Sequence, residues 1–109
     1  HDESEETLVA RVKTIHDNTF RLQRIAGQTV AKAHLTIKAA MEAGVPDAAL
    51  EDARAKVREA QWYWDWVAAE NGVGFHNPDK MTRTAGLAID LAHQAIESAE
   101  AARYGFQPI

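Results

Sequence analysis

The sequence has no cysteine, and this absence excludes disulfide bonds, thiolate metal sites and covalent haem attachment through the residues given. No apolar run approaches the roughly 18–20 residues that a membrane-spanning helix requires, so we expect no membrane span. The first six residues, His-Asp-Glu-Ser-Glu-Glu, are too acidic for a signal peptide.

Basic charge is also in short supply, since the formal net charge is −4. Lys and Arg are scattered along the chain without an evident basic stripe, which argues against nucleic-acid binding. What the chain has in excess is alanine, with 21 of 109 residues. Alanine favours helices and allows them to approach closely, but each residue buries little apolar area.

The apolar pattern predicts an all-α fold with three helices, one of them very long, packed as an antiparallel bundle or hairpin. We expect residues 1–109 to form a single helical domain. Ser4 is a candidate N-cap for the first helix, and Gly44 a candidate C′ residue at its end. Asn77 followed by Pro78 predicts the start of the third helix. The predicted seam of the first helix has a step of three or four, with a gap at Thr36, and consists of Leu8, Val12, Ile15, Thr19, Leu22, Ala26, Thr29, Ala33 and Ala40.

The seams of the other two helices follow the same spacing. That of the second helix comprises Leu50, Ala53, Val57, Ala60, Trp64 and Val67, and that of the third comprises Met81, Ala85, Leu87, Ala88, Leu91, Ala92, Ala95 and Ile96. A first helix of about 40 residues reaches about 60 Å, whereas a second of about 23 reaches about 35 Å. We therefore expect part of the first helix, around residues 8–22, to need another partner: the third helix, a second copy, or a missing part of a larger protein.

The three tryptophans lie within five residues, Trp62, Trp64 and Trp66, just before a glycine-rich break that contains His76. Aromatic residues at helical spacing usually anchor a core, and that is the preferred interpretation of the tryptophans alone. They occupy two faces of the helix, however, which one hairpin partner would not bury. Gly72 and Gly74 permit close approach of a bulky group, so an imidazole at residue 76 is a candidate axial ligand of haem iron.

The other histidines are weaker candidates. His16 and His34 have no ligating residue one turn later, so solvated or interface positions are expected. His93 has Asp90 and Glu97 within one turn, which could form a surface zinc site, although a solvated ion pair is the better interpretation. A di-iron carboxylate site would need a Glu-x-x-His motif on two helices, and neither that nor a phosphate loop or catalytic triad is present.

The segments Trp-Tyr-Trp-Asp at 62–65, Ala-Glu-Asn at 69–71 and Gly-Phe-His-Asn-Pro at 74–78 resemble the carboxy-terminal part of the ammonia-forming cytochrome c nitrite reductases. Those are periplasmic multihaem enzymes that reduce nitrite to ammonium. The opening residues are similar to those that follow the cysteines of the family's last haem-attachment motif. The resemblance covers essentially the whole chain.

The resemblance implies that His76 is a distal axial ligand of one haem c iron and His1 the proximal ligand of the last haem. It also implies a homodimer built on the long helices and contact with the remainder of the multihaem enzyme. The family's catalytic residues and haem-attaching cysteines have no counterpart here, so the segment alone is expected to be inactive. Without its haem-bearing partner it should self-associate through the His76 and tryptophan surface. The alternative is a free-standing helical dimerisation or interaction module with no redox role.

Overall fold

The computed structural model describes residues 2–72 and 77–106, apart from the side chains of residues 2, 3, 15, 16, 71 and 72. Three helices account for almost all of them: α1 (Asp2–Glu42), α2 (Asp47–Gly72) and α3 (Pro78–Gly105). The predicted all-α fold with one very long helix is confirmed. The described helices contain no stretch long and apolar enough to cross a bilayer.

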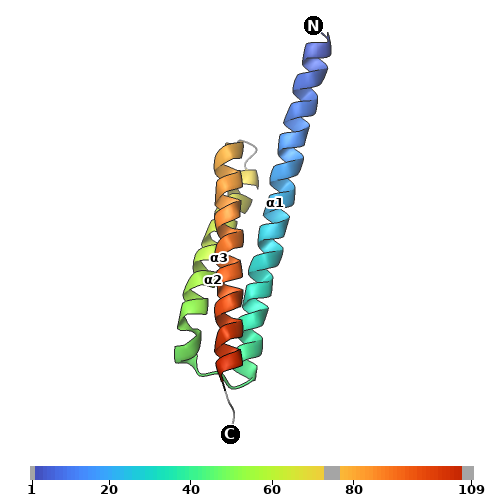
Figure 1. Ribbon diagram of the computed structural model, residues 1–109. Helices are drawn as coiled ribbons and strands as arrows, with labels where there is room; N and C mark the ends of the chain where they lie inside the picture. The colour runs from blue at the N-terminus through green and yellow to red at the C-terminus, as the bar shows by residue number, and fades with distance from the viewer. Residues whose placement is uncertain (1, 73–76, 107–109) are drawn as a thin grey trace.

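Consecutive helices run in opposite directions, so α2 is antiparallel to both of its neighbours and α1 is parallel to α3 (Figure 1). α3 packs extensively on both other helices, whereas α1 and α2 touch each other over a smaller area. The hairpin formed by α1 and α2 is therefore held together mainly through α3. The result is a narrow rod with principal extents of 73 × 19 × 16 Å.

The helix ends follow local capping chemistry. Gly44 has a φ of 96°, its N–H donates to the Met41 carbonyl, and the Val45 N–H donates to the Ala40 carbonyl. This pair of bonds is a Schellman motif, and Val45 and Ala40 are both buried beside it. At α3, the Asn77 side chain accepts from the Lys80 N–H at 3.1 Å, and Pro78 occupies the first turn. Both predicted boundaries are confirmed.

Ser4 is not an N-cap, because α1 already begins at Asp2. Ser4 lies inside the first turn, where its exposed side chain faces solvent. The acidic residues around it lie near the positive end of the helix dipole, which favours the earlier start.

The core is a seam of small side chains. Its larger cluster joins all three helices, and the only large side chains that are almost fully buried in the described chain are Leu50, Met81 and Val67. The buried face of α3 consists of Met81, Ala85, Ala88, Ala92, Ala95, Ile96 and Ala99. The predicted seam of α2 is confirmed, although Trp64 is only partly buried. Leu87, predicted on the core face of α3, is wrong: it is 49% exposed, because it lies on the opposite side of the helix from Ala85 and Ala92.

The first part of α1 projects beyond the other two helices (Figure 1). Thr19 is buried and Leu22 half-buried, so α2 and α3 cover the helix from about residue 19 onward. Leu8 and Val12 continue the same seam but are 55% and 65% exposed. The expected uncovered stretch is therefore present, although it is shorter than predicted at its carboxy-terminal side.

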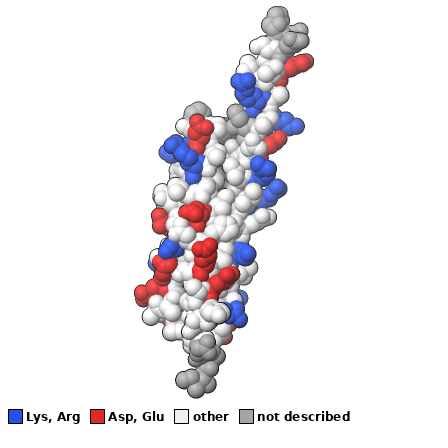
Figure 2. All heavy atoms as spheres, viewed as in Figure 1, with Lys and Arg blue, Asp and Glu red and all other residues white. Residues whose placement is uncertain are grey.

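Charge is unevenly distributed over the rod. Residues 11–38 of α1 include six Lys and Arg and one acidic residue, Asp17, whereas α2 carries six acidic and three basic residues. Figure 2 shows blue side chains mostly along α1 and red ones gathered over the other helices. The expectation of scattered basic residues is wrong in three dimensions, because helical geometry gathers those of α1 on one exposed side.

A tryptophan–glycine contact joins α1 to α2. The Trp64 indole N–H donates to the Gln23 carbonyl at 2.9 Å, and the ring lies directly over Gly27. A Cβ at residue 27 would lie 2.9 Å from the indole nitrogen, which is closer than real Cβ contacts allow. The sequence marks Gly27 only as a weak point in the helix, but the structure shows that the glycine makes room for the ring.

A second link joins α2 to α3 through Asp52. Its carboxylate accepts from Lys56 Nζ at 2.7 Å, one turn along α2, and also from the Ser98 hydroxyl on α3. These two hydrogen bonds, with that of Lys56 the larger contribution, lower the pKa of Asp52 below its ordinary 3.8.

We predict that Gly27→Ala destabilises the fold by about 1 kcal/mol, because overpacking against Trp64 outweighs the gain in helix propensity. Gly86 on α3 is the matched control, since a Cβ added there would have no neighbouring atom within 4 Å. Gly86→Ala should stabilise the protein by about 1 kcal/mol. Urea unfolding monitored by circular dichroism measures both, and equal effects of the two substitutions would contradict the steric argument.

We predict that Ser98→Ala raises the pKa of Asp52 toward 3.8. Because the folded-state pKa is lowered, the stabilisation by ionised Asp52 is fully present above pH 3.8 and is lost as the pH falls through the folded-state value. The stability difference between wild type and Asp52→Ala should therefore be constant near neutral pH and shrink only below pH 3.8. Carbon NMR titration of the carboxyl group measures the first effect, and acid unfolding curves measure the second.

Candidate functional site

The candidate site is the end of the rod where α2 gives way to α3. α2 ends at Gly72, and α3 begins at Pro78 after the Asn77 cap. His76 and His1, the two predicted iron ligands, lie outside the described residues. Their ligand roles therefore stay predictions, and the geometry that bears on them is that of the side chains on either side of the corner.

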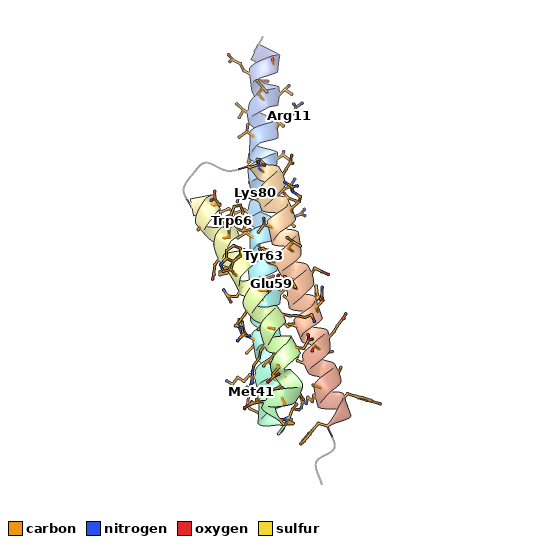
Figure 3. The ribbon with its side chains drawn as sticks, turned by 90° about the vertical axis from the view of Figure 1, so that its left-hand side faces the viewer. Arg11, Met41, Glu59, Tyr63, Trp66 and Lys80 are labelled. Carbon is orange, nitrogen blue, oxygen red and sulfur yellow. The ribbon has the colours of Figure 1, made fainter. Side chains whose placement is uncertain are left out.

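A cation–π contact connects the two helices next to this corner. The Lys80 ammonium lies 5.0 Å from the centroid of the Trp66 ring, and the two side chains approach each other in Figure 3. Beneath them, Val67, Met81 and Ala85 form a small second core with Leu22 and Trp66 packed against it. Such a contact contributes about 0.5–1 kcal/mol at an exposed site, so the helix ends on both sides of the corner are fixed relative to each other.

Trp62 lies on the outer side of α2 and is 64% exposed. Its ring meets that of Tyr63 edge to face, with centroids 5.4 Å apart. Core anchoring thus explains Trp64, which packs on Gly27, and in part Trp66, but it is wrong for Trp62. The expectation that the three rings cover more than one face is confirmed, because Trp62 has no partner ring or core contact from α1 or α3 among the described residues.

His34 takes part in a polar chain between α1 and α2. Its Nε2 lies 3.2 Å from Gln61 Oε1, and Gln61 in turn donates to Asp65 Oδ1 at 2.9 Å. The histidine is exposed, as predicted. The arrangement links two helices through an amide, and neither distance involves a metal-binding geometry.

His93 is also exposed, and Asp90 beside it accepts a hydrogen bond from Gln94 at 2.8 Å. No group of three or more His, Cys, Asp or Glu side chains able to hold a metal ion occurs among residues 2–72 and 77–106 with described side chains. Glu70, half-buried, lies in the last turn of α2. The polar residues of α3 are thus those of a solvated helix surface.

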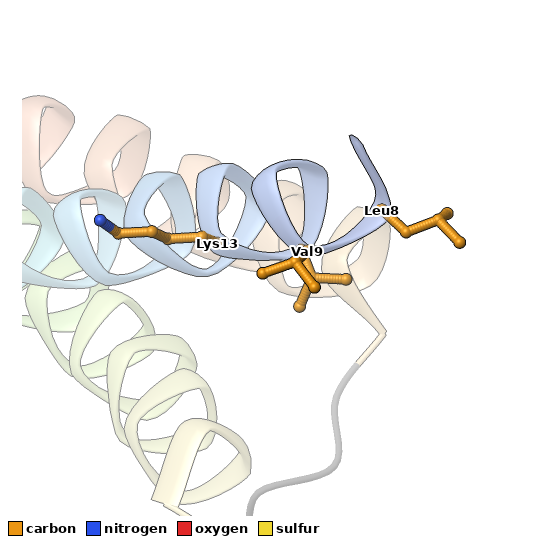
Figure 4. A pocket seen from close by; sticks show the side chains of 4 residues that line it. Leu8, Val9 and Lys13 are labelled. Atoms are coloured by element: carbon orange, nitrogen blue, oxygen red, sulfur yellow. The ribbon is translucent and has the colours of Figure 1, made fainter. Parts of the chain in front are cut away.

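The hollows in the described surface are open grooves rather than enclosed cavities. One is lined by Leu8, Val9, Val12 and Lys13 on the projecting part of α1, and Figure 4 shows these side chains standing clear of the other helices. Another lies between α1 and α2, where Phe20, Arg24 and Trp64 are among the residues that line it. The sequence did not predict this second groove, because it depends on the position of Trp64 over Gly27.

Comparison with known proteins gives a consistent family. The family profile described as cytochrome c552 matches residues 1–107. A cytochrome c-552 of Bacteroides fragilis is 38% identical over 98 residues, which are 87% of this chain and 19% of the relative. A cytochrome c nitrite reductase subunit NrfA of Nitratidesulfovibrio vulgaris is 38% identical over 111 aligned residues, covering 95% of this chain and 21% of the relative. A cytochrome c-552 of Haemophilus ducreyi is 35% identical over 99 residues, which are 87% of this chain and 19% of the relative.

No solved structure matches the chain significantly. The chain spans about a fifth of the length of the curated relatives that it matches. A family profile that matches nearly every residue, supported by relatives 35–38% identical over most of the chain, shows that this protein belongs to the cytochrome c552 family.

Proposed function

We propose that this chain is the carboxy-terminal helical domain of a multihaem cytochrome c nitrite reductase, an enzyme that reduces nitrite to ammonium. The carrying observation is the family match over residues 1–107, with a named nitrite reductase subunit among the relatives. In this proposal residues 1–109 form one domain that supplies structure and an iron ligand, while the catalytic residues lie elsewhere in the enzyme. Alone, the segment is inactive.

The residues of the chain fit a haem as contributors of ligands, not of attachment points. Haem c is bound covalently through cysteines, and this sequence has none, so the attaching cysteines belong to another part of the enzyme. The corner between α2 and α3 adjoins Trp66 and follows the exposed Trp62, so an apolar aromatic surface is present for a porphyrin. His76 would supply a neutral imidazole nitrogen to iron, and His1 would supply a second haem.

When bound, the haem supplies one-electron transfer through its iron. The chain's own contribution is to hold each imidazole in place and to keep water from the ring. Trp66, Lys80 and the small core beneath them support this role because they brace both helix ends that flank residue 76. In keeping with its relatives' class, we place the enzyme in the periplasm.

We also propose a homodimer through the projecting part of α1. Leu8, Val9 and Val12 are exposed there and extend the core seam without a partner among the described residues. Glu5 and Glu6 precede this patch, and Arg11 and Lys13 lie within or after it. Two copies in antiparallel orientation would place the acidic turn of one opposite the basic turn of the other, which favours a two-fold contact.

A helical interaction module with no redox role is the second candidate. It is favoured by the closed core, since the three helices bury Leu50, Val67 and Met81 without help from another chain. Intact mass and the optical spectrum of the product of the full gene separate the two proposals. A haem-bearing polypeptide several times longer than this chain supports the reductase, and a haem-free product of this length supports the module.

We predict that His76→Met in the haem-bearing enzyme raises the midpoint potential of one haem by an amount on the order of 100 mV, because a thioether ligand favours ferrous iron. The spectrum of that haem should lose its bis-histidine signature. Spectroelectrochemistry measures both changes. His93→Met, on the exposed surface of α3, is the matched control and should leave every haem unchanged. Unchanged potentials in the His76 variant would contradict the ligand role.

We predict that Leu8→Asp weakens the dimer about tenfold or more, because it places a charge within an apolar contact. Leu87→Asp is the control, since Leu87 is similarly exposed but lies on α3, away from the projecting segment. Sedimentation equilibrium of the intact protein measures the dissociation constants. Equal effects of the two substitutions would rule out this surface as the contact.

A further inference from the structure

The basic side of α1 is the largest charged feature that the proposed function does not use. Six cations occur within residues 11–38, and all six side chains are exposed or half-exposed: Arg11, Lys13, Arg21, Arg24, Lys32 and Lys38. None of them takes part in the ion pairs between described residues, which involve Arg54 and Lys56 on α2. With one acidic residue in the same stretch, the local net charge is 6 − 1 = +5 on a chain whose total is −4.

Helical periodicity gathers these residues away from the core. The buried positions of α1 are Thr19, Ala26, Thr29, Val30, Ala33, Ile37 and Ala40. Lys13, Arg24 and Lys38 are spaced by 11 and 14 residues, close to whole numbers of helical turns, so they form one row. Arg21 and Lys32, 11 apart, form a second row beside it. We call the two rows together the basic face of α1.

Large apolar side chains interrupt the basic face. Phe20 is 54% exposed and Leu35 is 64% exposed, and each lies within one turn of a cation. Phe20 and Arg24 also line the groove that ends at the Trp64 ring. Exposed apolar groups within a row of cations are typical of an interface, where aromatic residues and arginine are enriched.

The charge pattern selects the kind of partner. A lipid surface is disfavoured, because Asp17 and Gln28 lie between the two rows where a membrane-bound helix would be apolar. An acidic protein surface with apolar side chains complements the face in both respects. Since the chain spans about a fifth of its relatives' length, about four-fifths of such a protein can provide that surface.

We infer that the basic face of α1 is the docking surface for the remainder of the enzyme, and that the docked surface is rich in carboxylates. This inference rests on the proposed function, since it requires the longer polypeptide. It assigns the two unpartnered surfaces of α1 to different occupants. The exposed seam around Leu8 takes a second copy, and the basic face takes the rest of the same chain.

Lysine acetylation of the intact haem-bearing protein, read by mass spectrometry, tests this inference. Lys13, Lys32 and Lys38 should react about tenfold more slowly in the native protein than after denaturation, as expected for buried amines. Arg24→Glu should restore much of their reactivity. Arg58→Glu, a charge reversal on an exposed residue of α2, is the matched control and should not.

Three results would overturn the inference. Native lysines that react as fast as denatured ones would show that the basic face is uncovered. Protection that disappears on dilution to the monomer would show that a second copy covers it. Equal effects of Arg24→Glu and Arg58→Glu would show that the protection is not specific to this face. Because the haem spectrum is measured separately on the same samples, loss of the His76 assignment would leave these results interpretable.

Discussion

The close packing of alanine on α3 is the constraint on which the rest of the structure depends. Five of the seven buried residues of that helix are alanines, and it faces both other helices at once. Small side chains let helix axes approach to the lower end of the usual range of about 8–10 Å, where backbone and side-chain atoms contact along the whole length. A bulkier seam on α3 would separate α1 from α2, and Trp64 would no longer reach Gly27.

This packing also accounts for the surfaces that remain open. A seam of alanines buries little apolar area, so the larger apolar side chains are either at the ends of the core or outside it. Leu8, Val12 and Trp62 are all more than half exposed, at the projecting end of α1 and on the outer side of α2. A protein that was complete as a three-helix rod would have little reason to keep them there, and the family's much longer members provide one.

Fold and family membership come together at the corner between α2 and α3. The structure shows what surrounds the corner: a capped helix start at Asn77, a lysine over Trp66, and a small core with Met81. The family match shows to which group of proteins the corner belongs. The assignment of an imidazole to iron joins these two observations and is the proposal on which the enzyme function rests.

Much of the fold was determined by local sequence. Periodicity predicted the three helices, and the chemistry of glycine and asparagine predicted the boundaries at Gly44 and Asn77, because these depend on residues only a few positions apart. The resemblance of residues 62–78 to a known family was likewise legible in the sequence. The placement of Ser4 as a cap failed because a long helix can extend past any single capping residue into a favourable acidic turn.

Only the tertiary structure decided which faces are covered. It showed that Gly27 makes room for Trp64, that Trp62 points away from the core, and that Leu87 is exposed. It also gathered the cations of α1 into one face that looks scattered in the linear sequence. The physical reason is the same in each case: the number of neighbours a side chain has depends on how far each helix overlaps the others, and overlap is a property of the packed bundle rather than of any one segment.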